Sequence, residues 1–296
     1  MAFDGELYAM LTTLCWTGSA LAFSAATMRI GSVYVNVMRL LIAIIFLFGT
    51  ILISGISFGV SLPQIWYLSL SGFVGFVFGD TFLFKSYEYN SARLSSLVMS
   101  SAPAITAILG FFFLGERLTI LGTLGMLITA IGIALVVLER KETSSSSIPI
   151  SMAGIFYAFL GAIGQAGGLI LAKSAFTLGP VNGFVATLIR ASSAIVILAP
   201  LNYFAGRFTQ PIRIFKNDWK AFLYTTIGSF MGPYLGVTFG LIAISLTDVA
   251  IAATIMAMVP IIMLPTVWLL FRERLTLRSI IGACIAVTGV SILFLR

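Results

Sequence analysis

Long, uninterrupted apolar runs constrain the fold of this chain more than any other feature. Runs of about 18 or more residues recur along the sequence, and each is long enough to cross a bilayer core of roughly 30 Å. Only 9% of the residues are charged and 59% are hydrophobic, so the charges cannot cover a water-facing surface. Backbone amides in lipid need internal partners, and the runs are continuous rather than alternating. The sequence therefore predicts an all-α membrane protein.

The apolar runs divide into ten predicted transmembrane helices. Their approximate bounds are 7–26, 33–54, 65–84, 94–114, 119–138, 150–172, 181–204, 219–243, 249–271 and 276–295. A serine-rich stretch at 141–147 is predicted to be a linker between halves 1–140 and 148–296. The first run is predicted to be a retained helix rather than a signal peptide, because the residues before it include Asp4 and Glu6 and no Lys or Arg.

A constant spacing relates the two halves. The pairs separated by 157 residues include Gly75 and Gly232, Gly79 and Gly236, Thr81 and Thr238, Phe82 and Phe239, Pro103 and Pro260, Glu116 and Glu273, Gly125 and Gly282, and Gly132 and Gly289. Further upstream the spacing shortens, and Arg39 and Arg190 are 151 residues apart. Five helices per half is an odd number, so the second half must enter the membrane from the opposite side. This predicts two inverted-topology repeats, an architecture of secondary transporters.

Lys and Arg are distributed unevenly between the two predicted faces. The face that carries both termini has three, at Arg117, Lys173 and Arg296, whereas the loops of the other face have twelve. Basic loops prefer the cytoplasm, which predicts that both termini lie outside. The net charge of +7 is explained by these loops, and no nucleic-acid partner is expected.

Several sequence elements together carry a family resemblance. They are Trp16 in the first helix, Arg39 early in the second, Ala102-Pro103 leading to Gly115-Glu116-Arg117-Leu118-Thr119, and the second copy at Val259-Pro260 and 272–276. This pattern resembles the drug/metabolite transporter superfamily, EamA type, over nearly the whole chain. The resemblance implies ten helices in two inverted halves, export of amino acids, other metabolites or drugs, and a cavity lined by the first, third, fourth, sixth, eighth and ninth helices. It also implies cytoplasmic termini, opposite to the charge distribution, so the orientation stays open.

Asp80 is the sharpest candidate functional residue. It lies within the otherwise apolar run 65–84, and a carboxylate there must face the bundle interior, a cavity or a cation. It could couple protons or bind a cationic substrate group, or it could form a structural ion pair with Arg39; both interpretations are kept. Arg39 and Arg190 could bind a substrate carboxylate, but their presence in both halves favours a structural role.

The remaining candidates would shape or line a cavity. Pro103 and Pro260 are predicted to kink their helices near the middle, and Met99 and Met256, one turn earlier, could form adaptable apolar walls. Polar or amphipathic groups that could bind a substrate are Trp16, Ser19, Gln165, Tyr234 and Thr238. Ordinary packing is an equally good explanation for each of them.

The sequence predicts a secondary active transporter of the plasma or inner membrane. Its expected role is export of small organic metabolites such as amino acids by alternating access, with protons as a candidate coupling ion. The alternatives are a broad-specificity exporter of drugs or organic cations, and a non-transporting membrane sensor or scaffold. There is no histidine and there are only two cysteines, so no metal, cofactor or enzymatic activity is expected. The expected partners are a small-molecule substrate and lipid, with the chain as a monomer.

Overall fold

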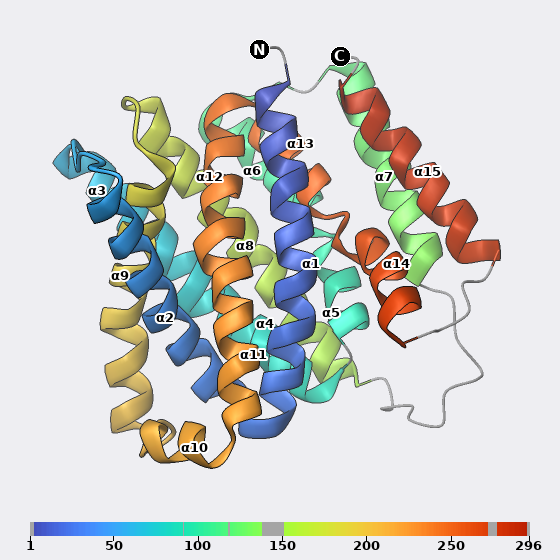
Figure 1. Cartoon of the computed structure of the whole chain (residues 1–296). Coiled ribbons are helices and arrows are strands. Elements are labelled where there is room, and N and C mark those ends of the chain that lie inside the picture. The colour runs from blue at the N-terminus through green and yellow to red at the C-terminus, as the bar shows by residue number, and fades with distance from the viewer. Residues whose placement is uncertain (1–2, 91, 118, 138–150, 272–276, 295–296) are drawn as a thin grey trace.

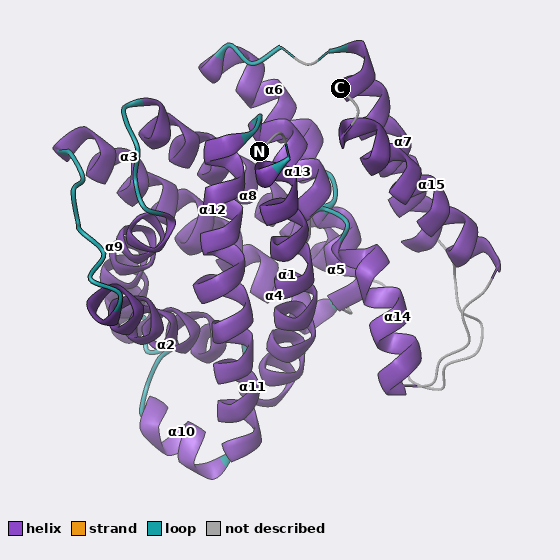
Figure 2. Cartoon of the chain, turned by 45° about the horizontal axis from the view of Figure 1, so that its top comes forward, coloured by secondary structure: helices purple, strands orange, loops and turns teal. Residues whose placement is uncertain are grey.

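The computed structural model describes residues 3–90, 92–117, 119–137, 151–271 and 277–294. Within these ranges the chain consists of helices and connecting loops (Figure 2). The elements of the first half are α1 (Asp4–Ile30), α2 (Ser32–Ile53), α3 (Leu62–Gly72), the π-helical segment η1 (Phe73–Gly79), α4 (Asp80–Tyr89), α5 (Ala92–Met99), α6 (Ala102–Leu114) and α7 (Ile120–Val137).

The second half repeats this order. Its elements are α8 (Met152–Thr177), α9 (Gly183–Phe204), α10 (Pro211–Asn217), α11 (Trp219–Ser229), the π-helical η2 (Phe230–Gly236), α12 (Val237–Leu246), α13 (Val249–Met256), α14 (Val259–Phe271) and α15 (Leu277–Phe294). Every element from α3 to α7 has a counterpart that begins and ends 157 residues later, and α9 follows α2 by 151 residues. The spacing found in the sequence thus extends to the element boundaries, with the short helix α10 as an addition.

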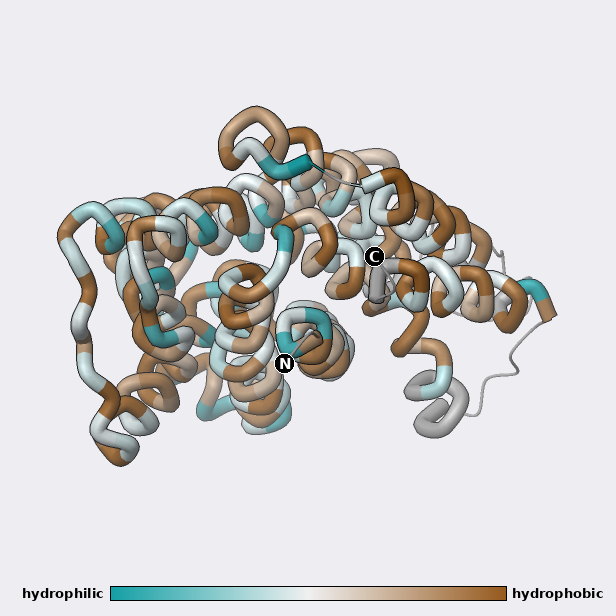
Figure 3. The backbone as a smooth tube through the Cα atoms, turned by 90° about the horizontal axis from the view of Figure 1, so that it is seen from above, coloured by the Kyte–Doolittle hydropathy of each residue, from teal (hydrophilic) through white to brown (hydrophobic). Residues whose placement is uncertain are grey.

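Seven helical segments are long and apolar enough to cross a membrane. They are Asp4–Ile30, Ser32–Ile53, Leu62–Tyr89, Leu94–Leu114, Met152–Thr177, Gly183–Phe204 and Trp219–Leu246. Shorter apolar helices cover Ile120–Leu135, Val249–Pro265 and Ile280–Ile292. Large apolar side chains such as Ile45 and Phe112 are more than two thirds exposed, and the outer helices are predominantly hydrophobic (Figure 3). A surface of this kind requires lipid around it.

The third membrane segment of each half contains a π-helical stretch, which the sequence did not predict. In η1 and η2 the hydrogen bonds skip one additional residue, a departure from α-helix that is often found at functional sites. Glycines end both stretches, at Gly79 and Gly236. In η2, Pro233 also lacks the backbone N–H that a regular helix would use.

The two π-helical stretches pack differently against the first helix of the other half. Along α8 and η1, backbone meets backbone, because a Cβ placed on Gly164 would overlap the Gly79 backbone, and one placed on Gly168 would lie 3.1 Å from the Gly75 Cα. Along α1 and η2, side chains fill the contact instead. There Trp16 covers Gly236, and Ser19 and Phe23 cover Gly232.

The fourth apolar segment of each half is broken into two helices. The breaks fall between Met99 and Ala102 and between Met256 and Val259. The predicted bends at Pro103 and Pro260 thus fall at these breaks, and each proline takes the second position of the later helix, where its missing N–H removes no helical hydrogen bond.

The two breaks face each other across the junction between the halves. The Ser100 hydroxyl donates to the Ala257 carbonyl over 3.3 Å. These residues are 157 positions apart, so a residue here contacts its own counterpart.

The counterpart helices α7 and α15 also pack against each other, at one edge of the molecule (Figure 1). Gly132 approaches Gly282 and Ala286, and Gly289 approaches Gly125 and Thr129. A higher residue number on α7 thus pairs with a lower one on α15, so the two helices are antiparallel. Small residues allow this close approach in lipid.

The two ends of the molecule carry different elements. The start of α1 and the end of α15 lie at the same end, and α10 lies at the other (Figure 1).

Candidate functional site

A cavity of about 130 Å³ lies between the two halves. Its walls come from α1, α2, η1, α4, α5 and α6 of the first half and from α8, η2, α12, α13 and α14 of the second. The breaks in the fourth segments open onto it, because Met99, Ser100, Met256 and Ala257 are among the lining residues. The cavity therefore sits where the two repeats meet.

The structure brings seven of the predicted residues to the cavity and leaves five away from its lining. The lining includes Trp16, Ser19, Arg39, Asp80, Met99, Gln165 and Met256. The other five are Pro103, Arg190, Tyr234, Thr238 and Pro260. Tyr234 shares a hydrogen bond of 2.8 Å with Thr50, and the Thr238 hydroxyl donates to Thr187 over 3.0 Å, so these two polar groups join helices.

Asp80 forms an ion pair with Arg39 on the cavity wall. The Arg39 Nη2 donates to the Asp80 Oδ2 over 2.5 Å, and the exposed fractions of the two side chains are 4% and 16%. The Arg39 Nε donates to Asn36, whose amide in turn donates to Thr81. The carboxylate is thus held by a cation from α2, yet part of it still faces the cavity.

Aromatic rings surround the Arg39 guanidinium, a feature that the sequence analysis missed. Its Cζ lies 4.9 Å from the ring centre of Phe84, 5.5 Å from that of Phe76 and 5.9 Å from that of Phe23. Such contacts stabilise a desolvated cation. The sequence signal was weak, because the chain has 25 phenylalanines and only the folded arrangement shows which of them meet the arginine.

Several polar groups on the cavity wall are free to bind a ligand. Within the described part of the chain, the Trp16 indole N–H, the Gln165 amide and the Tyr87 hydroxyl have no hydrogen-bond partner. Tyr87 and Ser96, also in the lining, were not identified from the sequence. The wall therefore combines aromatic surface with a few directed donors and acceptors, as small-molecule sites commonly do.

Polar contacts between the halves close the bundle at the end that carries the termini. The Glu116 carboxylate accepts from the Val249 N–H over 3.1 and 3.2 Å and so caps α13. Burial raises the pKa of Glu116 above its ordinary value of 4.5. Within the second half, Lys173 of α8 donates to the carbonyls of Ile244 and Thr247 at the end of α12. Glu273, the counterpart of Glu116, lies outside the described residues.

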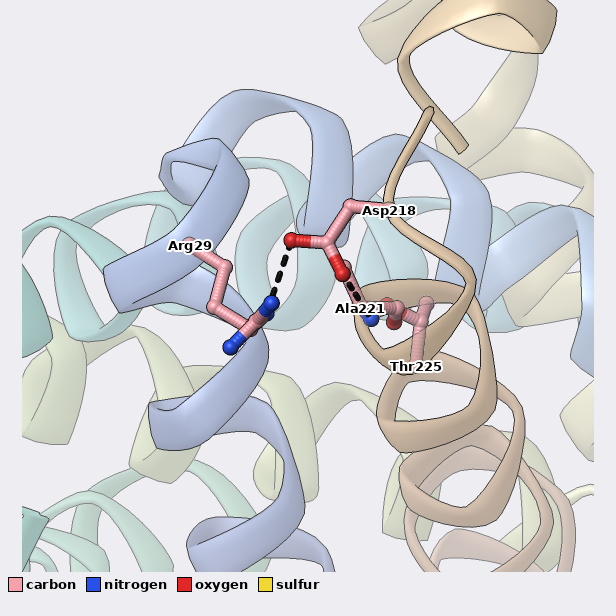
Figure 4. A network of polar contacts seen from close by, with 4 residues as sticks. All are labelled: Arg29, Asp218, Ala221 and Thr225. Atoms are coloured by element: carbon pink, nitrogen blue, oxygen red, sulfur yellow. Dashed lines mark hydrogen bonds and ion pairs between the residues drawn. The ribbon is translucent and has the colours of Figure 1, made fainter. Parts of the chain in front are cut away.

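A second set of contacts joins the halves at the opposite end. Arg29 of α1 pairs with Asp218 over 2.7 Å (Figure 4), and Asp218 also accepts from the Ala221 N–H at the start of α11. The hydrogen bond from Arg29 lowers the pKa of Asp218. Nearby, the Asn90 side chain exchanges two hydrogen bonds with the backbone of Ser151.

The fold and the cavity define a polytopic helical membrane protein with a central cavity between two similar halves. The EamA-like transporter family matches residues 4–138 and again residues 152–295. The chain belongs to this family, and it is an integral multi-pass protein of the cell membrane.

Individual relatives agree with this assignment. The uncharacterized transporter YxxF of Bacillus subtilis (strain 168) is 29% identical over 151 residues, which are 51% of this chain and 46% of the relative. The chain thus matches about half the length of that relative. A solved crystal structure superposes with a TM-score of 0.75 at 16% identity, covering 98% of this chain and 96% of the other. That likeness concerns the fold alone.

Proposed function

We propose that the chain is a secondary active transporter that exports small organic metabolites, such as amino acids, by alternating access. The observation that carries this proposal is the central cavity, which both halves line and onto which the broken helices open. Contacts between the halves lie on both sides of the cavity, with Glu116 and Val249 at one end and Arg29 and Asp218 at the other. Opening one set while the other stays closed would expose the cavity to one side at a time.

The arrangement of the helices supports ten membrane crossings in two inverted repeats. The counterparts α7 and α15 are antiparallel, as expected when each half crosses the membrane five times and the second enters from the opposite side. The shorter helices α7, α13–α14 and α15 would then complete the set of ten. The proposed assembly is a monomer.

Asp80 is the proposed coupling group. It is the acidic residue among those described as lining the cavity, and its contact with Arg39 gives it a partner when deprotonated. Protonation would release Arg39 and thereby link proton binding to a change of the cavity wall.

Export of organic cations is the second candidate, and the aromatic wall favours it. Rings of Trp16, Phe23, Phe76, Phe84 and Tyr87 line the cavity, and aromatic faces attract cations. Against this, the carboxylate of Asp80 is already neutralised by Arg39.

Uptake into proteoliposomes tests these proposals together. Labelled amino acids and organic cations are offered to vesicles with and without a pH gradient. Ala253→Phe, which would fill the cavity from α13, should abolish uptake, whereas Ile45→Phe on the lipid-facing surface should not. Size-exclusion chromatography checks that both variants are folded. If neither class of compound accumulates with the wild-type protein, the proposed transport of amino acids or organic cations is rejected, and the result favours a sensor or scaffold.

A further inference from the structure

Arg190 is a buried cation without a described counter-ion. Its residue is 3% exposed, and its Nε is fully buried without a hydrogen-bond acceptor. Among the described residues, no carboxylate lies at salt-bridge distance from its guanidinium, although the Phe76 ring centre lies 5.0 Å from its Cζ. A guanidinium keeps its charge in proteins, and an uncompensated buried charge is strongly unfavourable.

The counterpart arginine of the first half has both of the partners that Arg190 lacks. Arg39 donates through Nε to Asn36 over 3.0 Å and through Nη2 to Asp80 over 2.5 Å. The residues at the matching positions of the second half, 151 and 157 residues later, are Thr187 and Val237. The Thr187 side chain is too short to accept from the Arg190 Nε as the Asn36 amide accepts from the Arg39 Nε. The Val237 side chain has no hydrogen-bond acceptor.

Two hydrogen bonds show that the positions of Asn36 and Thr81 correspond in space to those of Thr187 and Thr238. In the first half Asn36 donates to Thr81 over 3.1 Å, and in the second half Thr238 donates to Thr187 over 3.0 Å. The same two pairs of elements, α2 with α4 and α9 with α12, are thus joined at the same place. By this equivalence, Val237 is the second-half counterpart of Asp80. The Arg190 guanidinium itself reaches η1 of the first half, where its Nη2 lies beside Gly75 and its Cζ lies 5.0 Å from the ring centre of Phe76, a residue of the cavity wall.

Val237 lines the central cavity, so the vacant counter-ion position borders the space in which a substrate would bind. Two guanidiniums and one carboxylate leave this region with one net positive charge. A carboxylate could accept from Nε and from one terminal nitrogen of a guanidinium at the same time. We propose that Arg190 binds the carboxylate of the transported molecule, which enters from the cavity past Val237. This inference rests on the proposed transport function and assigns its substrates to small carboxylates with an apolar body rather than to organic cations.

Supplying the missing carboxylate on the protein tests the proposal without a transport assay. Val237→Asp should melt several degrees above Val237→Asn in detergent, because only the aspartate provides Arg190 with a counter-ion. The two variants are nearly equal in size, so packing changes cancel. Adding Arg190→Gln to each should remove the difference. An aspartate variant no more stable than the asparagine variant would overturn the proposal.

Ligand-induced stabilisation provides the second measurement. Sodium propionate, isovalerate and phenylacetate should raise the melting temperature of the wild-type protein, and sodium chloride and tetramethylammonium chloride at equal ionic strength should not. Val237→Asp should lose this response, since its own carboxylate fills the position. Equal shifts in Val237→Asp, or the same shift with chloride, would overturn the assignment. Both measurements use purified protein, so a failure of transport in vesicles remains a separate result.

Discussion

At the scale of single residues, the ion pair of Asp80 and Arg39 combines the two roles that the sequence left open. The pair is structural, because it neutralises a cation in the membrane interior, and it lies on the cavity wall. The carboxylate and its partner could be anticipated, since a charge in an apolar run needs compensation. The aromatic surroundings of Arg39 could not, because they depend on which of many phenylalanines the fold brings together.

Asp80→Asn is expected to lower the stability of the protein substantially. Removing one partner of a buried pair leaves the other charge uncompensated, which typically costs about 3–5 kcal/mol. The exposed pair of Glu88 and Lys85 provides the matched control, because breaking such a pair costs about 0–1 kcal/mol. Thermal unfolding in detergent compares Asp80→Asn with Glu88→Gln, and equal losses would contradict a structural role for the buried pair. If the folded asparagine variant still exchanges substrate but no longer responds to a pH gradient, Asp80 also couples protons.

Glu116 is expected to make stability depend on pH in a particular direction. Its pKa is raised by burial in the folded protein, so the folded state binds more protons than the unfolded state just above pH 4.5. Its contribution to stability therefore falls as pH rises from the ordinary carboxyl value through the folded pKa.

Glu116→Gln should remove that slope while retaining an acceptor for the Val249 N–H. Glu116→Ala should in addition lose about 1 kcal/mol with the helix cap. Melting temperatures measured across this pH range test both expectations, and an unchanged slope in the glutamine variant would refute the assignment to Glu116.

At the scale of elements, the sequence predicted the positions and order of the apolar segments better than their internal geometry. Hydrophobic length and the 157-residue spacing locate each segment, and α7 begins directly after Thr119, whose hydroxyl accepts from the Gly122 N–H. The π-helical stretches and the breaks before Pro103 and Pro260 could not be predicted. They arise from contacts between the halves, and nothing local distinguishes a kinked helix from two helices that meet at a proline.

The close contact of α8 with η1 should tolerate no added methyl group. Gly164→Ala would place a Cβ against the Gly79 backbone, and overpacking of this kind typically costs about 1–3 kcal/mol. Gly49→Ala, within helix α2 and with no atom near the added Cβ, should be neutral or slightly stabilising. The measurements are the yield and the melting temperature of the two purified variants, and both should be lower for Gly164→Ala. Equal values for the two variants would show that the α8–η1 contact can relax.

At the scale of the whole molecule, orientation in the membrane is the property on which sequence arguments disagree. The loop that contains Thr209 lies at the basic end with α10, and the loop that contains Ser57 lies between α2 and α3 at the other end (Figure 1). The excess of Lys and Arg predicts that the Thr209 loop is cytoplasmic, whereas the family resemblance predicts the opposite.

Cysteine labelling in intact cells resolves this conflict. Cys15 and Cys284 are first replaced by alanine, and Thr209→Cys and Ser57→Cys are then compared, both at exposed positions. The charge distribution predicts that a membrane-impermeant maleimide labels the Ser57 variant and spares the Thr209 variant. The reverse pattern would show that the usual orientation of the family holds, and equal labelling after lysis confirms that both sites are reactive.

The unequal contacts of the two π-helical stretches also bear on how the halves can move. Where α8 meets η1, both surfaces are smooth, since they are formed by the glycines Gly75, Gly79, Gly164 and Gly168. Where α1 meets η2, the side chains of Trp16 and Phe23 interlock with the opposing helix. Sliding along the first contact has to pass the Val74 side chain beside Gly167 and break the hydrogen bond from Ser71 to the Gly168 carbonyl, whereas sliding along the second must first disengage an indole ring. The α8–η1 contact therefore resists sliding less than the α1–η2 contact does. Although the two halves are similar, we expect their relative movement to take place mainly along the α8–η1 contact.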